Sequence, residues 1–108
     1  MPISPTDRQL LVRESIATIK QLANTPHDAG VKIAEEIGSQ VEDIDRIAGN
    51  KTVSQRCRAL MAAVETVYLT PVENTPAYIR IRSDRRVKLY NAIQELEASL
   101  RSVGLLST

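Results

Sequence analysis

The densest concentration of binding chemistry in this sequence lies in the stretch AYIRIRSDRRVKLYNAIQELEASL, between residues 77 and 100. Residues 80–88, which we call the basic segment, contain one acid, Asp84, and five bases: Arg80, Arg82, Arg85, Arg86 and Lys88. Guanidinium groups donate paired hydrogen bonds to phosphate and carboxylate oxygens. The basic segment therefore predicts binding of an anionic partner through these five side chains.

A second concentration of bases follows an acidic stretch. Residues 28–45 contain six acids and one base, whereas residues 46–58 contain no acid and four bases, among them Arg56 and Arg58. We take Arg56 and Arg58 as secondary candidates for contact with the same kind of partner. The structural alternative is that the basic segment pairs with the acidic face around Glu35 and Glu36. Exposed ion pairs contribute only about 0–1 kcal/mol, so such pairing would explain little of the stability.

Residues suited to catalysis or metal binding are few. His27 is the only histidine and Cys57 the only cysteine, and they lie thirty positions apart, without the spacing of a metal site. Cys57 falls on an apolar helical stripe, where a small buried hydrophobic residue is expected. The four glycines form no phosphate-binding loop. We therefore expect no enzymatic activity, no cofactor and no metal.

Composition narrows the class of protein. The chain has 108 residues, 43% of them hydrophobic, with no Phe or Trp and a net charge of +1. This length and composition predict one domain with an aliphatic core. A single cysteine excludes an intrachain disulfide, and the sequence shows neither a signal peptide nor a membrane-spanning run. The default expectation is a cytoplasmic protein that does not enter a membrane.

Four amphipathic helices should position these residues. Capping signals place their starts at Ser4-Pro5, at His27 or Asp28, at Thr52 and at Ser83. The stop signals are Asn24-Thr25-Pro26, Gly49-Asn50, Thr70-Pro71 and Gly104. The stripe expected in the fourth helix comprises Val87, Tyr90, Ile93, Leu96 or Glu97, Leu100 and Val103. The predicted fold is an all-α, antiparallel four-helix bundle of residues 1–108, with a longer connection between the third and fourth helices.

Two patterns of DNA-binding proteins also occur in the sequence. In VKIAEEIGSQVEDIDRIAGN, residues Ala34, Gly38 and Ile44 have the spacing of a helix-turn-helix, but the second helix would carry three acids toward DNA phosphates. We prefer one continuous helix there. YIRIRSDRRVKLYNAIQELEASL resembles the strand-then-helix half of a ribbon-helix-helix repressor, with Arg80 and Arg82 on the strand. After that helix only GLLST remains, whereas such repressors need a second helix.

These observations leave several functional hypotheses. The first is a small non-catalytic subunit or accessory protein of a larger protein or ribonucleoprotein assembly, contacting nucleic-acid backbone through the basic segment. Arginines early in a helix are disfavoured by its dipole, which hints at a functional reason for them. The second is an assembly factor that docks on an acidic protein surface, partly through Val72, Tyr78, Leu105 and Leu106. The third is a helix-turn-helix or ribbon-type DNA-binding regulator.

Overall fold

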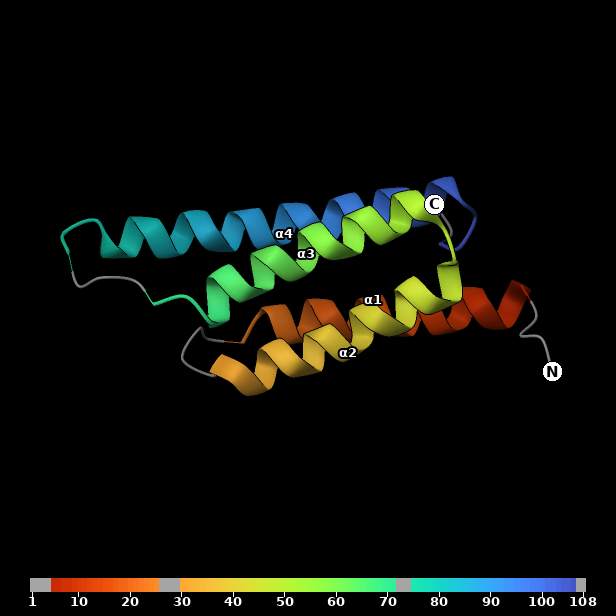
Figure 1. The fold of residues 1–108 in the computed structure, drawn as a ribbon, viewed down its shortest axis with the longest axis horizontal. Coiled ribbons are helices and arrows are strands. Elements are labelled where there is room, and N and C mark those ends of the chain that lie inside the picture. Colours follow the sequence, from red (N-terminus) through yellow and green to blue (C-terminus); the bar gives the residue numbers. More distant parts are fainter. Residues whose placement is uncertain (1–4, 26–29, 72–74, 107–108) are drawn as a thin grey trace.

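A computed structural model describes residues 5–25, 30–71 and 75–106 of the chain. It contains four helices, α1 (Pro5–Ala23), α2 (Gly30–Ala48), α3 (Lys51–Tyr68) and α4 (Tyr78–Ser102). Consecutive helices run in opposite directions, so the end of α1, the start of α2, the end of α3 and the start of α4 lie at one end of the molecule (Figure 1). The predicted all-α bundle is confirmed.

The helices pack as two hairpins. α1 packs on α2 and α3 packs on α4, while α2 and α3 join the two hairpins; α1 and α4 make far fewer contacts. The bundle is elongated, with extents of 53 × 23 × 20 Å. Within the described residues, no helix combines the length and the apolar character needed to cross a bilayer.

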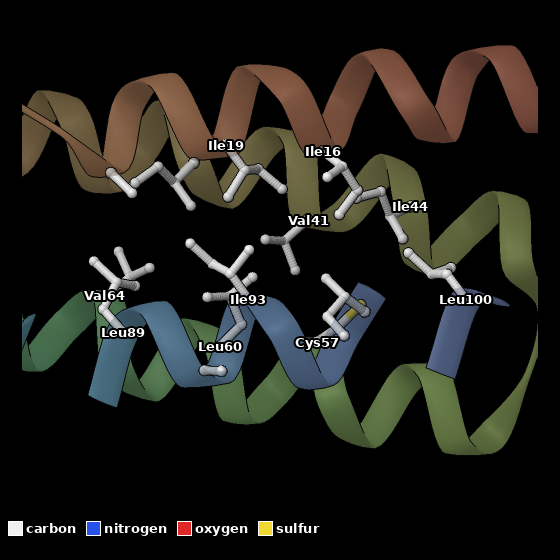
Figure 2. Close-up of a cluster of buried hydrophobic side chains, with 14 of the residues drawn as sticks. Ile16, Ile19, Val41, Ile44, Cys57, Leu60, Val64, Leu89, Ile93 and Leu100 are labelled. Atoms are coloured by element: carbon white, nitrogen blue, oxygen red, sulfur yellow. The ribbon is translucent and has the colours of Figure 1, made fainter. Parts of the chain in front are cut away.

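Aliphatic side chains from all four helices fill the space between the hairpins. Ile16 and Ile19 of α1 face Val41 of α2, while Leu60 of α3 and Ile93 of α4 point toward them from the other hairpin (Figure 2). Burying one side chain of this size stabilises the fold by about 1.5–3 kcal/mol. In the first three helices the buried apolar side chains recur at intervals of three or four residues, as Val12, Ile16, Ile19 and Ala23 do in α1.

The stripe predicted for α4 is partly wrong. Val87, Tyr90 and Val103 are exposed, and Leu89 is fully buried instead. The rest of the buried stripe of α4 comprises Ala92, Ile93, Leu96, Glu97, Ser99 and Leu100. Extended toward the start of the helix, the same three-and-four spacing reaches positions 85 and 82, which are arginines. The basic segment thus includes positions on the core-facing side of α4.

Two predicted helix starts are also wrong. Asn50 rather than Thr52 caps α3, and its side chain accepts a hydrogen bond of 3.1 Å from the Val53 amide. α4 begins at Tyr78, so Ser83 lies inside the helix. Residues 78–82 are therefore helical, not the strand that a ribbon-helix-helix arrangement requires. The predicted starts at Ser4 and at His27 or Asp28 lie outside the described residues.

The predicted ends of α2 and α4 agree with the backbone. Gly49 and Gly104 adopt φ values of +53° and +79°, in the left-handed region that glycine tolerates best. α2 runs unbroken through Gly38, as expected for one continuous helix. Beyond Gly104, the Leu105 amide donates to the Leu100 carbonyl at 2.8 Å, and Leu105 packs against the core.

Candidate anion-binding site

The basic segment occupies the first half of α4, at the end of the bundle where α1 and α3 terminate. α4 has 25 residues, whereas the other helices have 18 or 19. Its first turns consequently extend past the ends of the neighbouring helices (Figure 1). Because α4 starts at Tyr78, only Arg80 lies in its first turn, so the dipole penalty expected for cations early in a helix does not apply to Arg85, Arg86 or Lys88.

Arg86 binds the end of α1. Its guanidinium group donates to the carbonyl oxygens of Ala23, at 2.6 Å, and of Thr25, at 3.1 Å. The last carbonyls of a helix have no partner within it, and the helix dipole gives them additional negative potential. Arg86 therefore satisfies two acceptors at this helix terminus and ties α4 to α1, with which it otherwise makes few contacts.

Arg85 binds the end of α3 in the same way. One of its terminal nitrogens donates to the carbonyl oxygens of Thr66, at 3.2 Å, and Thr70, at 2.7 Å. Arg85 and Arg86 are adjacent in α4, but Arg85 binds the C-terminal end of α3 and Arg86 binds that of α1. We call Arg85 and Arg86 the inner pair.

Tyr68 lies beside Arg86 and bonds to the end of α1 and the residues that follow it. Its hydroxyl lies 3.1 Å from the Thr25 carbonyl and 3.3 Å from the Leu22 carbonyl, and donates to them. The guanidinium carbon of Arg86 lies 6.0 Å from the centre of the Tyr68 ring. Burial raises the pKa of Tyr68 above its usual value, and the charge and hydrogen bond of Arg86 partly offset this rise.

The remaining cations of the segment have different surroundings. Arg82 stacks on the Tyr78 ring, 3.9 Å from its centre, and its Nε is buried without a hydrogen-bond partner. Arg80 and Lys88 are exposed on the outer side of α4. We call Arg80 and Lys88 the outer pair. The five predicted residues therefore lie on one helix, with two held inside the fold and two facing solvent.

The structural alternative, pairing of these cations with the acidic face of α2, is not seen among the described residues. Both inner arginines bind carbonyl oxygens, and Glu35 and Glu36 are exposed. Among the described residues, no ion pair involves the basic segment. Carbonyl groups carry no formal charge, so in the part of the chain that the structure describes the inner pair is held in place by neutral acceptors and not by a carboxylate.

Arg56 and Arg58 belong to a separate region. They lie in the first half of α3, whose start is at the opposite end of the bundle (Figure 1). Arg56 forms an ion pair with Glu95 at 3.4 Å, and Arg58 lines a groove beside Asp45. The structure therefore does not join these two arginines to the basic segment.

Cys57 has the surroundings of a core residue. It is 3% exposed, and burial, together with the nearby charge of Asp45, raises the pKa of the thiol to about 12. Its nucleophilic thiolate form is therefore negligible near neutral pH. Within the part of the chain that the structure describes, no cluster of His, Cys, Asp and Glu side chains has a geometry suited to a metal ion.

A groove between α2 and α3 was not expected from the sequence. It has a volume of about 420 Å³, and its lining includes Ala34, Gly38 and Met61. Three carboxylates, Glu35, Glu42 and Glu65, line it. Glu35 and Glu42 are seven residues apart on α2, with the small residues Gly38 and Ser39 between them. This spacing places them along one side of the helix, and it is the signal in the sequence that could have revealed the groove.

Comparison of the chain with models of protein families, with curated proteins and with solved structures finds no match.

Proposed function

We propose that this protein is a small, non-catalytic helical subunit or accessory protein of a larger assembly, and that it contacts nucleic-acid backbone through the basic segment. The observation that carries the proposal is the cluster of cations near the start of α4, none of which forms an ion pair with a carboxylate of the described residues. The inner pair is fixed to neutral carbonyls, and the outer pair is exposed beside it on the same helix.

The geometry suits backbone binding rather than base recognition. A guanidinium group has five N–H donors, and the contacts of each inner arginine leave some of them available to a phosphate. Fixed side chains also lose less conformational freedom on binding. The chain has no Trp or Phe, and of its three tyrosines Tyr68 is buried, which leaves few aromatic surfaces for stacking bases.

The test measures binding to labelled single-stranded and double-stranded nucleic acid over a series of salt concentrations. Charge reversal of the outer pair, Arg80→Glu with Lys88→Glu, should weaken binding to every sequence and flatten its salt dependence. The outer pair is chosen because reversing Arg85 or Arg86 would place a carboxylate against helix carbonyls and damage the fold.

A matched control reverses two cations at the other end of the bundle. Arg46→Glu with Lys51→Glu changes the net charge by the same amount, and both side chains are exposed. This control should bind more tightly than the outer-pair variant. Equal affinities for the two variants, or no binding of the unaltered protein at low salt, would reject the basic segment as a nucleic-acid site.

A second candidate is docking on an acidic protein surface. Ile79 and Val87 are 78% and 53% exposed on α4, directly before Arg80 and Lys88 in the sequence. A phosphate backbone gives such apolar side chains no partner, whereas protein interfaces combine apolar anchors with arginine. Affinity purification with and without nuclease distinguishes the candidates, because nuclease releases material only from a nucleoprotein assembly.

A further inference from the structure

The start of α4 carries an aromatic ring with no polar link to another helix. Tyr78 is the first residue of α4, in the turns that extend past the ends of the neighbouring helices (Figure 1). The other two tyrosines are tied to the end of α1, because the Tyr68 hydroxyl donates to the Leu22 carbonyl and the Tyr90 hydroxyl donates to the Asn24 side chain. Tyr78 is partly exposed and forms no hydrogen bond with the described residues.

Arg82 covers one face of the Tyr78 ring. Its guanidinium carbon lies 3.9 Å from the ring centre, within the range of a cation–π contact. In contrast to the inner pair, Arg82 forms no hydrogen bond or ion pair with the described residues. In this part of the chain no second cation stacks on the ring. The stack therefore positions a guanidinium group whose terminal donors have no partner within the fold described.

An aromatic ring stacked on a guanidinium group is suited to binding an unpaired base. Every base has a flat π-face, and proteins that bind single strands stack bases on aromatic rings and on arginine. The terminal nitrogens of Arg82 and the exposed Arg80 supply donors for the phosphate next to such a base. Bases within a duplex stack on one another, so their faces are not accessible to a side chain of this kind unless the duplex is opened.

We propose that the Tyr78–Arg82 pair stacks on one unpaired base, and that single-stranded nucleic acid is the ligand of the basic segment. The inference rests on the proposed function and names the ligand class of the same site. Stacking is tolerant of sequence, so it adds affinity to backbone binding without recognition of particular bases. Loss of one stacked base should weaken binding at least about fivefold.

The test measures binding of labelled oligothymidylate and of an abasic strand of the same length at one low salt concentration. The two strands carry the same number of phosphates, so the comparison isolates the contribution of the bases. The unaltered protein should bind oligothymidylate at least about fivefold more tightly than the abasic strand. A closed duplex serves as a third ligand, because its bases are all paired.

Variants of the tyrosines locate the contact. Tyr78→Leu removes the ring and keeps every charge, so it should abolish the preference for oligothymidylate over the abasic strand. Its affinity for the duplex should change less than its affinity for oligothymidylate. Tyr78→Phe keeps the ring and should retain the preference. Tyr90→Leu is the matched control, since it removes the other partly exposed tyrosine of α4, and it should retain the preference as well.

Tyrosine emission supplies a second readout, because a stacked base quenches the emission of the ring beneath it. Oligothymidylate should quench the protein more than the abasic strand does, and Tyr78→Phe should remove this difference while binding normally. A quenching difference that persists in Tyr78→Phe would place the stacked base at another tyrosine and overturn the proposal.

The outcomes separate this inference from the proposed function. Equal affinities of the unaltered protein for the two single strands, or equal losses for both strands in Tyr78→Leu, would overturn the stacking site alone. Weakened binding of both strands by Arg80→Glu with Lys88→Glu would still support backbone binding in that case. Failure of every strand to bind at low salt would reject the proposed function and this inference together.

Discussion

The inner and outer pairs of the basic segment lie on the same helix and have the same charge, but their surroundings differ. Arg85 and Arg86 donate to the last carbonyls of α3 and α1. Arg80 and Lys88 face solvent. The difference shows that a run of cations in a sequence need not form one functional unit. Position on the helix determines whether a cation is bound to carbonyl groups of the fold or faces solvent.

The comparison also explains why α4 can extend beyond its neighbours. From Leu89 onward its core-facing positions are apolar except for Glu97 and Ser99, and before that point they are basic. The change occurs where α1 and α3 end, and there the surfaces that face α4 are no longer side chains but carbonyl groups. An arginine suits this place because its long apolar stem packs on the core while its guanidinium group reaches the helix termini.

Removing the inner pair should produce the largest effect on stability. The double substitution Arg85→Met, Arg86→Met keeps the apolar stems but leaves the terminal carbonyls of two helices without these donors. Hydrogen bonds to charged groups contribute about 1.5–3 kcal/mol each, and some carbonyls will recover a partner in water, so we expect a loss of about 2–4 kcal/mol. Urea unfolding followed by circular dichroism measures this. The substitution Arg80→Met, Lys88→Met is the control. An equal loss of unfolding free energy in both variants would refute the distinction between the inner and the outer pair.

A smaller effect should appear in the titration of Tyr68. Arg86 favours the phenolate form, so Arg86→Met should raise the pKa of Tyr68 further above its usual value. Absorbance of the phenolate against pH, in a background with Tyr78→Phe and Tyr90→Phe, follows this group alone. The folded state binds the Tyr68 proton more tightly than the unfolded chain, so stability should fall as pH rises above about 10. A Tyr68 titration that Arg86→Met leaves unchanged would contradict the contact.

Much of the fold was predictable because the first three helices have regular apolar stripes and strong stop signals. Gly49 is an example, since its left-handed backbone follows from residue type and position, and Gly104 ends α4 in the same way. The start of α4 was not predictable in this way. Ser83 has the residue type of a helix cap, whereas Ala77, the actual N-cap residue, makes no side-chain cap. With the start of the helix placed at Ser83, Val87 and Tyr90 were assigned to the core, whereas Leu89 is the residue that is buried there.

The sequence was enough to single out the five cations of the candidate site, but not to tell which of them bind the fold and which face solvent. Residue type and spacing suffice to find five cations near one another in the sequence. The acceptors of the inner pair, such as the Ala23 and Thr66 carbonyls, come from distant parts of the chain. Backbone carbonyls have no signature in residue type. Only the packing of α1 and α3 against α4 brings them to the arginines, and the α2–α3 groove likewise depends on the relative placement of two helices.

The central claim is that guanidinium geometry, and not positive charge alone, holds the inner pair in the fold. Parallel urea unfolding of Arg86→Lys and Arg80→Lys tests it most directly, because both substitutions preserve the charge. Lysine cannot donate to the Ala23 and Thr25 carbonyls as the arginine fork does, so Arg86→Lys should lower the unfolding free energy by about 1 kcal/mol or more. Arg80→Lys should change it by less than about 0.5 kcal/mol, as for other exposed positions. Equal effects of the two substitutions, or full stability of Arg86→Lys, would contradict the claim.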